Sequence, residues 1–388
     1  MRLPAADGAL AAYEPGPARE WARPVARITS RIAYAAAHVV PRVTGANVPG
    51  APAEIDWDAT LGYRHRIWEY GLGVAEAMDT AQRGMGVGWE QAAELIRRCA
   101  AEARSVGGRI AAGAGTDQLD LTTLPQGAAG LRAVTDAYRR QIEVVAGAGA
   151  KVIVMASRAL AQVARSADDY AQVYGSLLQE AHEPVILHWL GTVFDPSLAG
   201  YWGSDDIDRA TGTFRDVIGA HAAAVDGVKV SLLDATHEIA LRRALPAGVK
   251  LYTGDDFNYP ELITGDAQGF SHALLGIFAA IYPTASVALQ ALDAGEPSQA
   301  RQLLDGTREL GRLIFEAPTY HYKTGIAFLS WLNGFQPGFT MVGGLHGARS
   351  VVHLSQVFQL ADQAGLLVDP DGAARRMRAY LITAGVPQ

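Results

Sequence analysis

A lysine interrupts one of the most apolar stretches of the sequence. Lys229 lies inside VDGVKVSLLD, residues 225–234, a run whose continuous hydrophobicity is typical of a strand buried on both faces. Burying an ammonium group is unfavourable unless it is paired or loses its proton, and a neutral amine is a nucleophile toward carbonyl carbon. The position therefore favours Schiff-base chemistry. A lysine that only pairs with a carboxylate such as Asp234 or Asp255, holding two strands together, is the structural alternative.

The other three lysines occupy different positions. Lys151 and Lys250 open predicted strands, and Lys323 begins a predicted helix. The starts of barrel strands lie at the end of a barrel that does not carry its chemistry. We therefore expect the side chains of all three lysines to be solvated.

The elements that must position Lys229 are short apolar runs, each followed by a stretch of helical periodicity. Continuous rather than alternating hydrophobicity in these runs indicates a parallel sheet covered on both faces. Eight such units in about 290 residues favour a (β/α)8 barrel over an open doubly wound sheet. The predicted strands lie within residues 31–40, 73–78, 109–115, 151–157, 184–190, 227–233, 249–254 and 269–274.

From about residue 284 onward the pattern is helical only. We expect a (β/α)8 barrel with an N-terminal extension over residues 1–290 and a C-terminal helical subdomain over residues 291–388. Residues 273–292 carry no charge, but a proline and several polar residues interrupt them, so we expect a buried helix and not a membrane span. The predicted C-terminal helices lie within residues 298–317, 322–335, 348–365 and 371–385.

Composition excludes several classes of partner. The 388 residues carry a formal net charge of −7 and no cluster of Lys and Arg, so we expect a small-molecule partner and no nucleic acid. Cys99 is the only cysteine, so the chain cannot form an internal disulfide. The first residues, MRLPAADGALAAYEPG, lack the apolar core of a secretory signal. We therefore expect a soluble, cytoplasmic protein that does not bind membranes.

The order of motifs resembles that of the dihydrodipicolinate synthase and N-acetylneuraminate lyase superfamily, roughly over residues 73–385. The most specific pieces are VDGVKVSLLD and YTGDDFNYPELITGDAQGFSHALLGIFAAIYP, residues 252–283. Further similarity lies in GAGAKVIVMAS and DAGEPSQARQLLDGTREL. The resemblance implies a class I aldolase-type lyase on a (β/α)8 barrel, a divergent branch of that superfamily. It also implies no cofactor and a homo-oligomer, a dimer or a tetramer.

Carried over to this chain, the resemblance assigns Lys229 the iminium with a keto acid or a related carbonyl compound. The family usually ends its fifth strand in Tyr-Asn, whose phenol relays protons, and here the matching stretch is PVILHWLGTVFDP with His188 at the tyrosine position. An imidazole can act as a general acid or base near neutral pH. We predict this proton-transfer role for His188, with a core or metal-ligating histidine as the alternative.

A second departure concerns substrate binding. After its second strand the family carries Gly-Thr-Thr-Gly-Glu, which holds the substrate carboxylate, whereas this chain has EAMDTAQRGMGVG, so the resemblance does not extend to pyruvate specificity. The long loop at residues 191–212 brings aromatic and acidic residues that suit a sugar ring, or else form a structural lid. The predicted substrate-binding residues are Asp79, Thr80, Trp189, Trp202, Gly254, Asp255, Asp256, Ser271 and His272.

Two other functions remain open. Metal-dependent aldolases and isomerases use similar barrels, and several His, Asp and Glu residues lie near predicted strand ends. A ligand-binding homologue without activity is the other alternative, although a buried lysine is unfavourable without a use. The candidate ligands for the metal alternative are Glu76, Asp79, His188, His237, Asp255 and His272.

Overall fold

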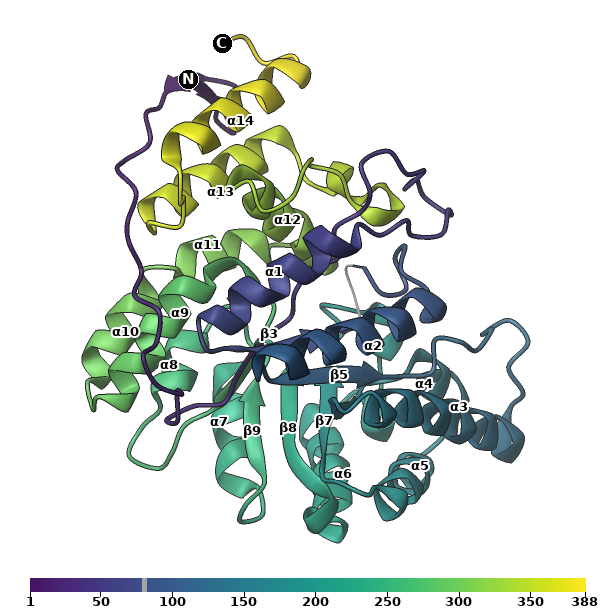
Figure 1. The fold of residues 1–388 in the computed structure, drawn as a ribbon. Coiled ribbons are helices and arrows are strands. Elements are labelled where there is room, and N and C mark those ends of the chain that lie inside the picture. The colour runs from purple at the N-terminus through teal and green to yellow at the C-terminus, as the bar shows by residue number, and fades with distance from the viewer. Residues whose placement is uncertain (79–81) are drawn as a thin grey trace.

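The structure is a computed structural model that describes residues 1–78 and 82–388. In this part of the chain eight parallel strands close into a barrel (Figure 1). Each predicted strand run overlaps one of them, so the predicted (β/α)8 fold is confirmed. In barrel order the strands are β3 (Ala33–Ala35), β4 (Gly73–Glu76), β5 (Ile110–Ala114), β6 (Lys151–Val154), β7 (Val185–Leu190), β8 (Val225–Ser231), β9 (Lys250–Thr253) and β10 (His272–Leu275).

Helices follow the strands and cover the outside of the barrel. In α2, apolar residues three and four positions apart face the sheet, and Gly107 ends the helix with φ +66°, a conformation that glycine adopts without strain. The helices are α1 (Trp57–Glu69), α2 (Trp89–Val106), α3 (Gly127–Gly147), α4 (Arg158–Val163), α5 (Ala167–Glu180), α6 (Ile207–Ala220), α7 (Ala235–Ala244), α8 (Tyr259–Thr264) and α9 (Phe278–Asp293).

The remaining helices form a layer at one end of the barrel (Figure 1). The predicted helix at 298–317 is two helices, α10 (Pro297–Asp305) and α11 (Arg308–Ile314). Between them the hydroxyl of Thr307 hydrogen-bonds that of Tyr259 at 2.6 Å, which ties the break to α8. The others are α12 (Tyr322–Leu332), α13 (Val351–Gln363) and α14 (Pro370–Thr383). Within residues 1–78 and 82–388, no helix has the length and hydrophobicity needed to cross a membrane.

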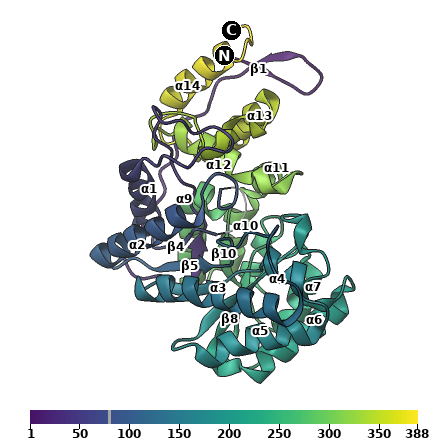
Figure 2. The same ribbon diagram turned by 90° about the vertical axis from the view of Figure 1, so that its right-hand side faces the viewer.

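The two ends of the chain lie close together on this helical layer (Figure 2). A hairpin of β1 (Arg2–Pro4) and β2 (Leu10–Ala12) packs on α13. The hydroxyl of Tyr13 donates to Asp362 at 2.7 Å, and the Tyr13 and Phe358 rings meet edge to face at 5.8 Å. The N-terminal extension therefore begins on the C-terminal helices.

The C-terminal region also covers part of the barrel at its strand ends. Lys323, in α12, donates a hydrogen bond from Nζ to the carbonyl of Ala36, which directly follows β3. Nearby, Nε2 of His38 lies 2.7 Å from Oε1 of Gln336. These contacts bring side chains from α12 and the loop after it to the end of the barrel where chemistry is expected.

Candidate active site

Lys229 faces the lumen of the barrel. It lies in β8, where it pairs with His188 of β7 and Tyr252 of β9. Tyr252 belongs to the cluster of side chains that fills the lumen, and residues paired across a parallel ladder share a face of the sheet. Lys229 is 8 % exposed. A Cβ placed on Gly254 would lie 2.9 Å from Cε of Lys229, so the absence of a side chain at Gly254 makes room for the lysine.

His188 is completely buried beside Lys229. Its Nε2 lies 3.2 Å from Oγ of Ser231, the next lumen-facing residue of β8. Burial, together with the positive charge of Lys229, holds the pKa of His188 well below its usual value. The imidazole is therefore neutral at pH 7 and a weak base while Lys229 is charged.

The adjacent carboxyls of Asp255 and Asp256 have different environments. Asp255 accepts hydrogen bonds from the backbone N–H of Phe257 and of Asn258 and from the Asn258 side chain, at 2.8–2.9 Å. It shapes the turn before α8, and its oxygens are already engaged. Asp256 accepts one hydrogen bond, from the Ile277 N–H at 2.7 Å.

Asp256 has the properties of a proton-transfer group. It is 3 % exposed, and burial raises its pKa to about 7, against the opposing effects of the Ile277 hydrogen bond and the charges of Lys229 and Lys323. A pKa near the working pH suits a general acid or base. The sequence placed Asp256 among the substrate-binding residues and gave no sign of this shift.

The position of Lys323 contradicts the prediction that its side chain is solvated. It is 4 % exposed and not solvated, because α12 directs it onto the carbonyl of Ala36 at the end of the first barrel strand. Burial and the charges of Arg64 and Lys229 lower its pKa to about 7, while Glu76 and Asp256 oppose that shift. A second lysine thus shares the electrostatic environment of Lys229.

Ser271 and His272 do not meet Lys229 at the strand ends, because β10 begins at His272. The hydroxyl of Ser271 donates to Glu238 of α7 at 2.7 Å, outside the lumen. Nδ1 of His272 accepts from the Ile32 N–H at 2.9 Å, and its ring lies 5.5 Å from that of Tyr252. The structure therefore places both residues at the start of β10 and not at the strand end where we expected them.

Trp189 and Trp202 also lie away from the lumen. Trp189 follows His188 in β7, and successive side chains of a strand point to opposite faces. Trp202 has no exposed surface; its ring lies 4.6 Å from that of Tyr174 and 4.7 Å from that of Phe214. Both indoles pack between β7 and the helices α5 and α6 and not at the end of the barrel that carries Lys229.

Asp79 and Thr80 lie outside the described residues. Close to them in sequence, Arg83 donates to both oxygens of Asp117 at 2.7 and 3.0 Å and to the carbonyls of Ala77 and Gly113. A cavity of about 290 Å³ lies above the ends of β5 and β6, beside these groups. It is lined by Arg83, Gly84, Gly115, Thr116, Asp117, Leu119, Leu121, Met155, Ala156, Ser157, Arg158, Ala159 and Asp195.

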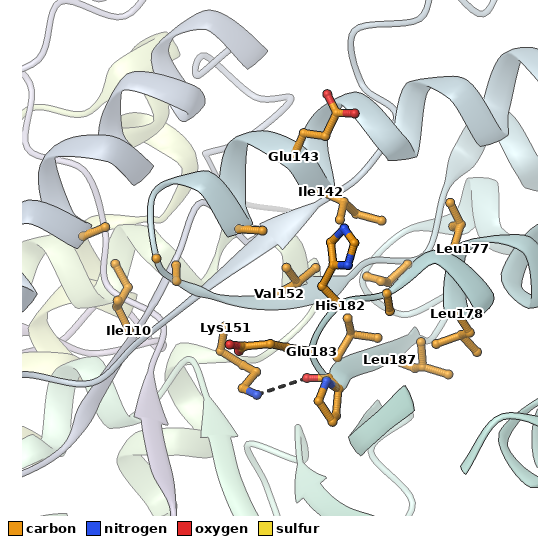
Figure 3. A pocket seen from close by; sticks show the side chains of 18 of the residues that line it. Ile110, Ile142, Glu143, Lys151, Val152, Leu177, Leu178, His182, Glu183 and Leu187 are labelled. Carbon is orange, nitrogen blue, oxygen red and sulfur yellow. Dashed lines mark hydrogen bonds between the residues drawn. The ribbon is translucent and has the colours of Figure 1, made fainter. Parts of the chain in front are cut away.

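A cavity of about 740 Å³ lies at the other end of the barrel. Figure 3 shows its apolar wall, which includes Ile142, Val152 and Leu187, and the hydrogen bond from Lys151 Nζ to the Pro184 carbonyl at 3.0 Å. The cavity is formed by strand starts and by the helices α2, α3 and α5. It therefore cannot deliver a ligand to the strand ends where Asp256 lies.

The candidate metal ligands that the structure describes do not converge. Within the described part of the chain, no group of three or more His, Cys, Asp and Glu side chains is arranged to hold a metal ion. Glu76 forms a buried ion pair with Arg64 at 2.6 Å, and Nε2 of His237 lies 2.8 Å from the hydroxyl of Thr211. The metal-dependent alternative thus lacks a ligand set among these residues.

Comparison with known families identifies the family of the chain but assigns it no activity. A model of the family described as protein of unknown function DUF993 matches residues 1–386, so the chain belongs to that family. No curated protein matches the chain.

Comparison with solved structures identifies the fold. Dihydrodipicolinate synthase from Aquifex aeolicus is 12 % identical, with a TM-score of 0.64, and the alignment covers 87 % of this chain and 99 % of that one. The Thermotoga maritima enzyme is 14 % identical, with 87 % and 100 % covered and a TM-score of 0.62. The chloride-inhibited Acinetobacter baumannii enzyme complexed with pyruvate is 16 % identical, with the same coverage and TM-score. The chain thus has a divergent form of the dihydrodipicolinate synthase fold.

Proposed function

We propose that this member of the DUF993 family is a Schiff-base-forming lyase that makes or breaks a C–C bond, or dehydrates its substrate, through Lys229. The observation that carries the proposal is the position of Lys229 in the lumen, on the sixth strand of the barrel, with Gly254 making room for its side chain. Asp256 and His188 lie in the same electrostatic environment. The substrate is a keto acid or a carbohydrate-derived carbonyl compound.

The first chemical step requires a neutral amine and an acid. Nζ of Lys229 attacks the carbonyl carbon, the carbonyl oxygen takes up protons and leaves as water, and a C=N⁺ iminium remains. Asp256, with a pKa of about 7, is protonated in a large fraction of molecules at neutral pH and supplies a proton to the departing oxygen.

The second step uses the iminium as an electron sink. When a C–H bond on the neighbouring carbon breaks, its electron pair enters the C–C–N system, an enamine forms and a proton is released. When a C–C bond there breaks instead, the same enamine forms, and the other fragment loses the proton of its hydroxyl and leaves as an aldehyde or ketone. The carboxylate of Asp256 takes the released proton. Reprotonation and attack by water then return the free lysine. His188 is the weaker base because burial keeps its imidazole neutral, so we assign it, with Ser231, to hydrogen bonding beside Lys229.

Trapping with borohydride tests the proposal. The protein is incubated with pyruvate, other 2-oxo acids or sugar-derived carbonyl compounds, reduced, and analysed by intact mass and peptide mapping. We expect an adduct of one substrate per chain on Lys229, absent in Lys229→Met and retained in the control Lys151→Met, which changes a lysine at a strand start. Circular dichroism confirms that the variants fold. An adduct elsewhere, or none with any of these compounds, would overturn the proposal.

We also propose, from the resemblance alone, that the enzyme is a cytoplasmic homo-oligomer. Light scattering coupled to size exclusion would measure its mass against the 41.1 kDa of one chain. A monomer at the concentrations used for trapping would contradict this part of the proposal and leave the chemistry at Lys229 unaffected.

A further inference from the structure

Lys323 is a buried cation without a carboxylate partner among the described residues. Its Nζ donates to the carbonyl of Ala36 and lies 5.1 Å from the centroid of the Tyr322 ring. No Asp or Glu oxygen of residues 1–78 and 82–388 lies within 4 Å of it. A carbonyl and an aromatic face stabilise an ammonium less than a carboxylate does, so the site is incomplete for a charged lysine.

The other cations at this end of the barrel are already paired. Arg64 forms an ion pair with Glu76 in which both side chains have no exposed surface. Arg83 is held by Asp117 and Arg158 by Asp195 at 2.5 Å. Lys323 differs from these three arginines because no Asp or Glu among the described residues forms an ion pair with it.

Lys323 lies close enough to Lys229 for the two charges to interact. It projects from α12 onto the end of the first strand, whereas Lys229 projects from the sixth, and the two charges act on each other and on Asp256. A cavity of about 20 Å³, enough for one water molecule or one oxygen of an anionic group, is bordered by Lys323 together with Met78 and Arg83. An anionic group there would neutralise the ammonium.

We propose that Lys323 is a second functional lysine of this site, a positioning residue that binds an anionic group of the substrate while Lys229 reacts with its carbonyl. The proposal rests on the function proposed above for Lys229. It assigns to the C-terminal helical region a direct part in substrate recognition.

The test compares two probes that differ in charge and hardly in shape, pyruvate and pyruvamide. Borohydride trapping over a range of concentrations gives, for each probe, a half-saturating concentration and a maximal rate. Lys323→Gln removes the charge but keeps a donor for Ala36, and Lys323→Arg keeps the charge. We expect Lys323→Gln to raise the half-saturating concentration at least tenfold for pyruvate and less than threefold for pyruvamide. Lys323→Arg should restore most of the preference for pyruvate.

Several outcomes would overturn the role of Lys323. An equal loss for both probes in Lys323→Gln, or no loss for either, means that the lysine is structural or uninvolved. If the wild-type protein forms no adduct on Lys229, the proposed chemistry fails. Calorimetric titration of pyruvate against wild type and Lys323→Gln then tests the lysine separately: binding weakened by the substitution supports anion recognition, and binding that is unchanged or absent overturns it.

Discussion

Two carboxyls that are adjacent in the sequence differ because their hydrogen-bond partners differ. Asp255 has three donors and stabilises the turn before α8. Asp256 has one donor and two lysines whose charges act on it, and burial brings its pKa to about 7. A group used for proton transfer must change its charge readily, and only the second carboxyl has that freedom.

Replacing Asp256 by Asn should therefore stop proton exchange at the carbon next to the iminium, while the iminium itself still forms, more slowly, with solvent as the acid. With pyruvate in D₂O, we expect the wild-type protein to exchange the methyl protons and Asp256→Asn to do so about 10²–10⁴-fold more slowly, with the borohydride adduct on Lys229 retained. Proton NMR follows the exchange. The matched change Asp255→Asn should keep the exchange and lower the free energy of unfolding by about 1–3 kcal/mol, because it introduces a donor where donors already point. Exchange that survives in Asp256→Asn would remove this residue from the mechanism.

Glu238 is a second carboxyl whose pKa is raised, and it affects stability instead. It is buried in α7, accepts hydrogen bonds from Ser271 and Thr253, and burial raises its pKa from 4.5 to about 8. Between these two pH values the unfolded chain has released the proton that the folded chain still holds. The contribution of Glu238 to the stability of the wild-type protein therefore falls as pH rises from about 4.5 to 8.

Glu238→Gln should remove this part of the pH dependence. We expect the stability of the variant relative to wild type to rise by about 4 kcal/mol between pH 4.5 and pH 8, since one pKa unit is worth about 1.4 kcal/mol. Urea unfolding at both pH values measures the difference. The exposed Glu309→Gln is the control and should change neither value. A variant that is equally destabilised at both pH values would show that Glu238 is not held neutral.

At the scale of elements, the sequence predicted every barrel strand because each is a short apolar run covered on both faces. It predicted less well which end of a strand a residue occupies. The run assigned to residues 269–274 forms a strand over His272–Leu275, and this shift moves Ser271 and His272 from the expected strand end to the strand start. In short strands a small error in the predicted strand boundary moves a residue to the wrong end of the barrel, since only a few residues separate the two ends.

Successive side chains of a strand point to opposite faces of the sheet, and the sequence-based prediction of substrate-binding residues did not make use of this rule. If His188 faces the lumen, Trp189 must face the helices, and the same rule places Lys229, Ser231 and their neighbours. No local rule covers Lys323. Its partner Ala36 is 287 residues away, and the start of α12 looks like any solvated helix end in the sequence. Long-range contacts of this kind are set by packing, so the residues that complete the candidate site were the ones missed.

At the scale of the whole molecule, the helical layer contributes Lys323 to the candidate site and also contacts both ends of the chain. In Figure 1 the first strand lies beside the last helices, and α13, which receives the hairpin, packs on α12, which carries Lys323. Residues 291–388, proposed as a subdomain, thus contact the N-terminal hairpin as well as the barrel, and the proposed boundary lies inside α9. Stability of this layer should depend on segments from both ends of the chain.

Deleting residues 1–13 should therefore destabilise the protein without abolishing the chemistry at Lys229. The deletion exposes the apolar surface around Phe358, now covered by Tyr13 and by Leu3, and we expect a loss of about 2–4 kcal/mol in the free energy of unfolding. Tyr13→Phe keeps the ring contact and removes the hydrogen bond to Asp362, so it should lose about 1 kcal/mol. Urea unfolding measures both changes, and borohydride trapping should still modify Lys229 because β8 is not among the elements that contact the hairpin. A truncated protein as stable as the full chain would mean that the hairpin is not part of the helical layer in solution.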